Sequence, residues 1–289
     1  MVGARPPGAR KGSRSVPPTG LAARDDGSRG QRQVRSVQHA VDVLHHLAEA
    51  DRPLGVSELA RRTGLNKSTV FHLLSTLQAR QLVAQDPESS CYQLSWGLYA
   101  LGASMTRTHS VAQAVRGKLE ALAQTTGETV LVGILDEATV LYIDRAESPS
   151  GLAMVANIGR RAPLHAVATG KVLLAHSPVA DVEKLLASTL PRLTPSTIID
   201  ADELRDQLET IRNQGFARCW QENEAGVSSI SVPVRDYTGR VVAALTIAGP
   251  ATRLTARAVR RQLIPLQQTA EAIQARLGAE GVPDPTTTR

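Results

Sequence analysis

Two features of membrane and secreted proteins are missing from this sequence. Its 289 residues contain no run of about 18 or more apolar residues, so we expect no membrane-spanning helix. The N-terminus carries Arg and Pro but lacks the apolar core of a secretory signal. We therefore expect a cytoplasmic protein with no membrane partner.

Cysteine is scarce, with only Cys91 and Cys219 in the chain. Two cysteines so far apart make no disulfide framework, and neither has partners at zinc-ligand spacing, so we expect no metal site. A phosphate-binding loop is also missing, because Thr169-Gly170-Lys171 lacks the upstream glycine of a P-loop. The sequence thus predicts no bound cofactor.

The composition fits two globular domains flanked by tails. The hydrophobic fraction is 42% and the net charge is +6, which permits nucleic-acid binding without proving it. Residues 1–30 are rich in Gly, Pro, Ser and Arg, so we expect a disordered basic tail. This tail either adds salt-sensitive DNA affinity or has no role. We also expect disorder over residues 278–289.

The stretch from Leu54 to Gln93 organises the rest of the chain. It predicts two short helices, the first with Ser57 as N-cap and Gly64 as a left-handed C-cap, the second beginning at Asn66. A third helix precedes them, with Ser36 as its cap and Val37, Ala40, Val41, Leu44 and Leu47 as its apolar stripe.

The helix that begins at Asn66 has two distinct faces. Val70, Leu73, Leu74 and Leu77 have the spacing of one buried face, and the opposite face carries Lys67, Ser68, Thr69, His72 and Ser75. A small, polar, cationic face on the second helix of such a pair is typical of a helix-turn-helix that enters the DNA major groove. An ordinary amphipathic helix pair remains the alternative.

A predicted hairpin follows directly. Leu82 to Ala84 and Cys91 to Leu94 have strand character, and Asp86 to Ser90 form the turn, while Val56 is expected in a short strand that pairs with this hairpin. A hairpin after a helix-turn-helix indicates a winged helix, whose wing usually lies along the phosphate backbone or minor groove.

Several motifs in order carry a family resemblance. They are the segment Val34 to Leu44, the helix pair, YQLSWGLYALG, GETV, YIDRAESP, PLHA with TGKVLLA, and GFA through ENEAGV. Together they resemble the IclR family of bacterial transcriptional regulators from about Gln33 to about Leu277. The resemblance implies an α/β (α+β) chain with an N-terminal winged helix-turn-helix, a linker helix and a C-terminal GAF-like effector-binding domain.

We expect the domain boundaries at residues 31–94 for the winged helix, 95–109 for the linker and 110–277 for the effector domain. The linker pattern is apolar on more than one side, which favours pairing with a second subunit over a place in a domain core. The effector domain is expected to contain helix Val111 to Thr126, strands Thr129 to Leu135 and Thr139 to Ile143, candidate strand Gly151 to Val155, a helix capped by Thr169, helix Asp202 to Gly215, strands Gly226 to Val234 and Arg240 to Ala248, and a helix Thr255 to Leu277 interrupted near Pro265.

The candidate DNA-binding residues are polar or cationic and lie on or beside the helix pair. They are Arg35, Ser57, Arg61, Arg62, Asn66, Lys67, Ser68, Thr69, His72 and Arg80. For Arg61 and Arg62, a solvated helix face is an equal alternative. The family usually has a proline and an arginine where this chain has Asn66 and His72, so no operator is carried over from relatives. The expected DNA partner is a roughly palindromic duplex bound by a homodimer or a dimer of dimers.

The resemblance also places a small-molecule effector pocket in the C-terminal domain. Carried across by position, its residues are Leu152, Met154, Ala168, Thr169, Cys219, Ser229, Thr246 and Ala248. Relatives often have an acidic residue in place of Cys219, and those that sense small oxoacids tend to have a hydroxyl in place of Ala248. This chain has neither, which favours a more apolar or aromatic effector.

Other function classes have to be weighed against a regulator, most often a repressor in this family. Cys219, His165 and Asp144 are catalytic residue types without a catalytic spacing, so we expect no enzyme. A thiol-based redox sensor would need a lowered pKa at Cys219. The remaining alternative is a metabolite-binding protein whose helix-turn-helix mediates protein contacts.

Overall fold

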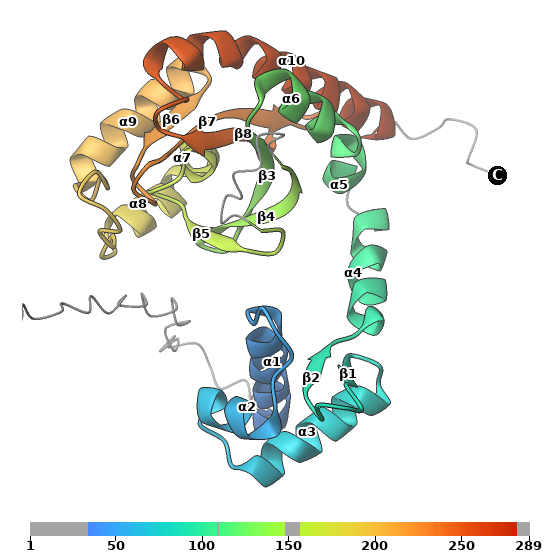
Figure 1. Cartoon of the computed structure of the whole chain (residues 1–289). Helices are drawn as coiled ribbons and strands as arrows, with labels where there is room; N and C mark the ends of the chain where they lie inside the picture. Colours follow the sequence, from blue (N-terminus) through green and yellow to red (C-terminus); the bar gives the residue numbers. More distant parts are fainter. Residues whose placement is uncertain (1–33, 109, 148–156, 282–289) are drawn as a thin grey trace, which may run out of the picture. The chain divides into compact units, whose positions relative to one another are not determined.

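The computed structural model describes residues 34–108, 110–147 and 157–281 (Figure 1). The chain divides into two compact units, residues 1–97 and 98–289. The tail expected over residues 1–30 and the candidate strand Gly151 to Val155 lie outside the described residues. None of the helices in the described ranges combines the length and the hydropathy needed to cross a membrane.

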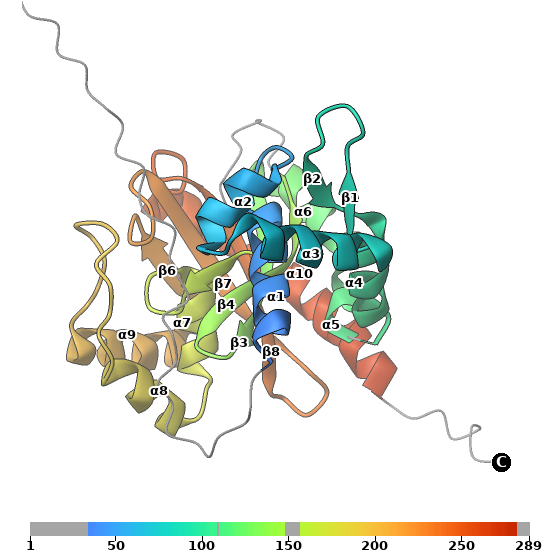
Figure 2. The same cartoon turned by 90° about the horizontal axis from the view of Figure 1, so that it is seen from below.

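The N-terminal unit is a small helical core with a two-stranded antiparallel hairpin. Its elements are α1 (Arg35–Ala48), α2 (Val56–Thr63), α3 (Lys67–Ala79), β1 (Val83–Gln85) and β2 (Tyr92–Leu94). Figure 2 shows the three helices clustered and the turn of the hairpin projecting beyond them. The core is formed by Val43, Leu47, Leu54, Leu59, Val70, Leu74, Leu77, Val83 and Tyr92. The predicted winged helix-turn-helix is therefore confirmed.

Helix α3 forms as its sequence predicts. Val70, Leu74 and Leu77 are buried on one face, and Asn66 caps the N-terminus by accepting a hydrogen bond from the Thr69 backbone N–H at 2.8 Å. Gly64 ends α2 in the left-handed conformation, with φ of 70°. These two local signals fix the turn between the helices.

Four local predictions in this unit are wrong. Ser36 and Ser57 lie inside the first turns of their helices, and Val34 and Gly55 are the N-caps instead. The residue that pairs with the wing is Leu54, through a bridge to Tyr92, rather than Val56. Helix α1 buries Val43 and Leu47, while Val37 and Val41 of the predicted stripe are 59% and 44% exposed.

Helix α4 (Trp96–Thr108) follows the wing at the place expected for the linker helix. Its first turn packs closely against the turn that follows α3, since a Cβ on Gly97 would lie 2.2 Å from the Gln81 carbonyl oxygen. Ser95 Oγ donates a hydrogen bond to the same carbonyl at 2.7 Å. The start of the helix is thus fixed to the winged domain.

The C-terminal unit is built on a six-stranded antiparallel sheet with the order β5-β4-β3-β8-β7-β6. The strands are β3 (Thr129–Asp136), β4 (Thr139–Ala146), β5 (Arg161–Pro163), β6 (Ala217–Trp220), β7 (Val227–Arg235) and β8 (Val241–Pro250). The four strands predicted within the described residues therefore form, and β5 and β6 extend the two edges of the sheet. This architecture agrees with the expected GAF-like α/β domain.

Helices cover both faces of this sheet. They are α5 (Ser110–Val115), α6 (Lys118–Thr126), α7 (Ala168–Ala175), α8 (Val179–Leu186), α9 (Ala201–Gln214) and α10 (Ala256–Gly281). One apolar core joins α5, α6 and α10 to one face, and a second joins α7, α8 and α9 to the other. Figure 1 shows α10 and α7 on opposite sides of β7 and β8.

Three helix predictions in this unit need correction, and one helix was missed. The single helix expected over Val111 to Thr126 is two, because Gly117 adopts a left-handed φ of 74° between them. Thr169 is not a cap, since α7 starts at Ala168 after Val167. Helix α10 continues through Pro265 and reaches Gly281, beyond the expected end at Leu277. Helix α8 was not predicted at all.

Candidate functional site

The exposed face of α3 carries the central candidate DNA contacts. Lys67 and His72 are exposed, and Thr69 is half-buried. Asn66 Oδ1 accepts from both the Thr69 N–H and Ser68 Oγ, the latter at 2.9 Å, so Asn66 and Ser68 are engaged in capping the helix. Lys67, Thr69 and His72 are consequently the side chains of this face best able to meet a base edge or phosphate.

The candidate phosphate contacts differ in availability. Arg62 Nη2 lies 2.7 Å from Glu58 Oε1, and Arg52 Nη2 lies 2.9 Å from Glu58 Oε2. The Arg62 and Arg52 guanidiniums hold the pKa of Glu58 below its ordinary value. To bind a phosphate, Arg62 would therefore have to break its ion pair with Glu58. Arg35, Ser57, Arg61 and Arg80 are exposed at helix ends or on the outer side of α2.

The wing is acidic. Between Gln81 and Thr106 the sequence has no Lys or Arg, and the turn of the hairpin carries Asp86 and Glu88. Asp86 Oδ1 accepts from the Glu88 backbone N–H at 2.9 Å, and this hydrogen bond lowers the pKa of Asp86. A negatively charged wing repels phosphate rather than attracting it.

The described effector candidates gather on the α7 side of the sheet. Cys219, Ser229 and Ala248 are direct cross-strand neighbours on β6, β7 and β8. Thr246 lies two residues before Ala248 and is linked to Thr169 by a hydrogen bond between hydroxyls at 2.8 Å. The other described candidate, Ala168, begins α7 and is fully buried. Leu152 and Met154 lie outside the described residues.

The N-terminus of α7 is buried at this place without a side-chain cap. Among the residues that the structure describes, none accepts a hydrogen bond from the backbone N–H of Ala168, Thr169 or Gly170. A helix N-terminus carries positive partial charge, and its first-turn N–H groups lack partners within the helix. This end of α7 can therefore receive a ligand oxygen.

Two residues that extend this polar cluster were not predicted. Ser231 and Tyr142 continue the pair Thr169 and Thr246 into a chain of four buried hydroxyls. Ser231 could have been found from sequence, because it lies two positions after Ser229 and so points to the same face of β7. Tyr142 belongs to β4, and only the three-dimensional fold brings it to the cluster.

The thiol of Cys219 is not a reactive one. Its side chain is buried and donates a hydrogen bond to the Ala166 carbonyl oxygen at 3.0 Å. Burial raises the pKa of Cys219 to about 12. A redox-sensing cysteine needs a lowered pKa, so the structure argues against this alternative.

The structure also does not bring the three residues of the catalytic alternative together. His165 Nε2 is 3.0 Å from the Pro191 carbonyl oxygen and donates to it in the tautomer that this contact requires. Asp144 interacts with Glu120 and Arg116, which lie on or beside α6, whereas Cys219 belongs to the core on the α7 side. The three residues do not form a triad. In the described ranges no group of three or more His, Cys, Asp or Glu is placed to hold a metal ion.

A buried ion pair lies beside the effector candidates. Lys171 Nζ is 2.6 Å from both Glu222 carboxylate oxygens, and the two side chains are 0% and 6% exposed. Thr194 and Thr197 Oγ1 donate to the Glu222 carbonyl oxygen at 3.3 and 2.6 Å. The pair therefore ties α7 to the segment after β6, and Lys171 is not available to a ligand.

His165 makes the stability of this domain depend on pH. Burial lowers its pKa below the ordinary 6.5, so the unfolded chain binds more protons than the folded one when the pH falls through this range. We expect the free energy of unfolding to fall from pH 7.5 to 5.5, with a slope of up to about 1.4 kcal/mol per pH unit for one proton. Denaturant titrations of His165→Gln should show a smaller slope.

The exposed His45 on α1 provides the matched control. His45→Gln should keep the slope of the wild type. An unchanged slope in His165→Gln would contradict the role that we assign to this histidine.

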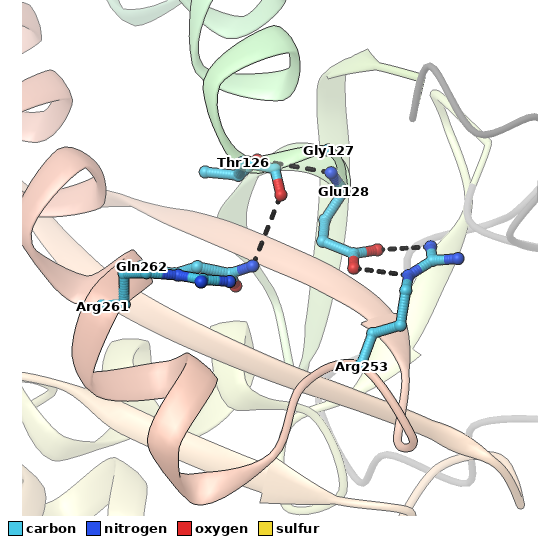
Figure 3. Close-up of a pocket in the computed structure, with 6 residues that line it drawn as sticks. All are labelled: Thr126, Gly127, Glu128, Arg253, Arg261 and Gln262. Carbon is cyan, nitrogen blue, oxygen red and sulfur yellow. Dashed lines mark hydrogen bonds and ion pairs between the residues drawn. The ribbon is translucent and has the colours of Figure 1, made fainter.

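A concavity lies between α6 and α10, on the face of the sheet opposite α7 (Figure 3). It has a volume of about 350 Å³ and is lined by Thr126, Gly127, Glu128, Arg253, Arg261 and Gln262. The buried Glu128 carboxylate receives two hydrogen bonds of 2.7 Å from Arg253, and Gln262 Nε2 donates to the Thr126 carbonyl oxygen at 3.4 Å. These contacts join α10 and the segment before it to the turn before β3, so we interpret them as structural.

Comparison with known families matches both units. The model described as the IclR helix-turn-helix domain matches residues 36–87, and the model described as the C-terminal domain of the bacterial transcriptional regulator IclR matches residues 103–275. The two models thus follow one another along this chain, one on each unit.

Individual relatives cover most of the chain. The HTH-type transcriptional regulator KdgR of Dickeya chrysanthemi is 35% identical over 251 residues, 86% of this chain and 82% of its own length. The HTH-type transcriptional repressor AllR of Escherichia coli K12 is 31% identical over 88% of this chain and 94% of its own. A crystal structure of an IclR homolog from Microbacterium hydrocarbonoxydans, complexed with 4-hydroxybenzoate, has a TM-score of 0.75 at 25% identity and covers 84% of this chain and 98% of that one.

Proposed function

Because the chain belongs to the IclR family of bacterial transcriptional regulators, we propose that it binds a roughly palindromic operator as a homodimer and responds to a small-molecule effector. It is a DNA-binding regulator, and its matches are regulators rather than enzymes. The observation that carries the proposal is the presence of both family domains in one chain. We place the protein in the cytoplasm, where a regulator meets chromosomal DNA.

We propose a separate role for each segment whose boundaries were expected from the sequence. Residues 31–94 bind DNA, residues 95–109 pair two subunits, and residues 110–277 bind the effector. The exposure of apolar side chains on α4 supports the pairing role, since Trp96, Tyr99 and Leu101 are 83%, 70% and 59% exposed in one chain. Two dimers can pair further into a tetramer, and sedimentation of the full chain distinguishes these states.

For DNA we propose that Lys67, Thr69 and His72 contact the major groove and that Arg35, Ser57, Arg61, Arg62 and Arg80 contact phosphates. Asn66 and Ser68 shape the start of the helix. His72 makes a weaker contact with DNA than the arginine that the family usually has at this position. Repression is the proposed direction, supported by the relative that is named a repressor.

For the effector we propose the cluster of Ala168, Thr169, Cys219, Ser229, Thr246 and Ala248, with Leu152 and Met154 as apolar wall. Alanine and cysteine replace more polar groups here, and Lys171 is neutralised by Glu222. These features support an apolar or aromatic compound with few polar groups. An oxygen of that compound can lie at the N-terminus of α7. One solved IclR homolog holds 4-hydroxybenzoate, which is a compound of this kind.

The operator itself provides the test of this proposal. A duplex with the full palindrome should bind two chains, and a duplex with one half-site should bind far more weakly at the same salt concentration. An effector should change this affinity only through its different affinity for the two arrangements of the dimer. Equal affinity for full and half sites would contradict dimeric recognition.

Because the wing is acidic, we predict that it weakens operator binding rather than strengthening it. Neutralising it with Asp86→Asn and Glu88→Gln should raise operator affinity by about three- to tenfold at low salt, because two like charges near phosphate are removed. Fluorescence anisotropy at several salt concentrations measures the change.

A charge-matched control comes from the effector domain, where Asp181 and Glu209 are exposed. The variant Asp181→Asn with Glu209→Gln changes the net charge equally and should leave affinity nearly unchanged. If the two double variants behave alike, the wing lies too far from DNA to matter.

A further inference from the structure

The four-hydroxyl chain in the proposed effector site has one fixed end. Ser231 Oγ donates to the Leu245 backbone carbonyl oxygen at 3.1 Å, and Thr246 Oγ1 donates to Ser231 Oγ at 2.8 Å. Thr246 Oγ1 and Thr169 Oγ1 are 2.8 Å apart, and Thr169 Oγ1 and the Tyr142 hydroxyl are 3.5 Å apart. All four side chains are buried, so water cannot readily reorder their protons.

The proton of each hydroxyl is assigned by counting from this end. A carbonyl oxygen can only accept, so it takes the proton of Ser231, and Ser231 can then only accept from Thr246. Thr246 has no second proton, so Thr169 must donate to it. Thr169 Oγ1 then has only lone pairs left to offer Tyr142, across their longer contact of 3.5 Å. The hydroxyls of Ser231, Thr246 and Thr169 therefore point their protons toward Leu245.

The direction of the hydrogen bonds determines whether Tyr142, at the far end of the hydroxyl chain, can donate or accept another hydrogen bond. When Tyr142 directs its only proton to Thr169, its oxygen keeps lone pairs but has no proton for another group. Burial raises the pKa of Tyr142, which keeps the phenol neutral. A carboxylate or carbonyl placed against this oxygen would meet lone pairs, whereas a hydroxyl or N–H would find an acceptor.

Close packing holds the four hydroxyl side chains in these positions. A Cβ on Gly133 would lie 2.7 Å from both Thr169 Cγ2 and Val140 Cγ1, so the glycine lets α7 approach β3 and β4 closely. Tyr142 shares an apolar core with Cys219, Ala168 and Ala248. Tyr142, the end of the hydroxyl chain that can only accept a hydrogen bond, thus belongs to the same cluster as the proposed effector residues.

We propose that the effector carries an uncharged hydrogen-bond donor, a phenolic or alcoholic hydroxyl, that donates to the Tyr142 oxygen. This inference rests on the proposed effector site and adds the polarity of the group that the site selects. Ser231 is then a positioning residue: it does not touch the ligand but sets the direction of the chain that Tyr142 terminates.

The test compares pairs of ligands in which a methyl group replaces the hydroxyl hydrogen of one member. Suitable probes are 4-hydroxybenzoate against 4-methoxybenzoate and benzyl alcohol against benzyl methyl ether, titrated into the full chain by calorimetry. We expect the hydroxyl member to bind about tenfold more tightly, since the ether leaves the buried acceptor unpaired. Tyr142→Phe, which keeps the ring, should reduce this preference to less than about twofold.

A remote variant separates proton order from packing. Ser231→Ala removes the acceptor of Thr246, which frees each hydroxyl to turn and lets Tyr142 donate outward. We expect the preference for the hydroxyl member to disappear, although Ser231 does not reach the ligand. Ser228→Ala is the control, because Ser228 is buried in the same strand but lies outside the chain.

Each outcome decides a different claim. A preference in the wild type that is lost in Ser231→Ala and kept in Ser228→Ala supports the inference. Binding of both members with equal affinity, or a preference unchanged in Ser231→Ala, overturns the inference and leaves the proposed effector site standing. Failure of every probe to bind overturns the aromatic effector class and the inference with it.

Discussion

Simultaneous Lys67→Ala and Thr69→Ala substitution is expected to abolish specific operator binding. Both side chains lie on the outer face of α3, and each base or phosphate contact of this kind contributes about 1–3 kcal/mol, so their joint loss should weaken binding by more than about 100-fold. Neither side chain packs in the core of the domain. Anisotropy titration of labelled operator measures the loss, and sedimentation should show an intact dimer.

The exposed Lys184 on α8 gives the control for loss of a positive charge. Lys184→Ala should bind the operator like the wild type. Specific binding that survives the double substitution on α3 would contradict the role of this helix. It would favour the alternative in which the helix-turn-helix mediates protein contacts.

The largest expected effect on stability comes from Lys171→Met. The substitution keeps the volume of the side chain but leaves the buried Glu222 carboxylate without its cation. Breaking one partner of a buried pair costs about 3–5 kcal/mol, which should lower the melting temperature of the C-terminal unit by about 10 °C. Calorimetry of the full chain measures this shift.

A second variant separates the lost charge from the changed shape. Lys171→Met combined with Glu222→Met should recover much of the loss, because an apolar pair of similar volume often replaces a buried ion pair without cost. Lys184→Met, at an exposed site, should change stability by less than about 0.5 kcal/mol. A double variant as unstable as Lys171→Met alone would indicate that packing, not charge, holds this site.

The recognition helix was predictable because its signals are local. The spacing of Val70, Leu74 and Leu77 and the cap at Asn66 operate within α3 itself. Ser36, Ser57 and Thr169 show where such signals fail. Each has a capping side chain but lies one or two residues inside its helix, because the helix begins earlier than the hydroxyl indicates.

Tertiary contacts decided the features that sequence did not predict. Helix α10 continues through Pro265 since Leu266, Ala270 and Ile273 keep the same buried face against the sheet, which outweighs one missing hydrogen bond. The edge strands β5 and β6 are short, at three and four residues, and each pairs with one neighbouring strand, β4 and β7 respectively.

The polar contacts of the effector domain depend on distant residues in the same way. Lys171 and Glu222 are 51 positions apart, and Thr169 and Thr246 are 77 apart. Family resemblance led us to propose Thr169 and Thr246 as site residues. It did not predict the hydroxyl chain, because the direction of that chain follows from Ser231 and the Leu245 carbonyl.

The central claim is that this chain recognises specific DNA, and capture of genomic fragments by the purified protein tests it most directly. The capture is done at physiological salt, which removes most non-specific phosphate binding. We expect enrichment of one or a few palindromic sites, lost in the Lys67→Ala and Thr69→Ala variant. Recovery of no site, with or without the aromatic probes, would contradict the assignment of the winged domain to operator binding.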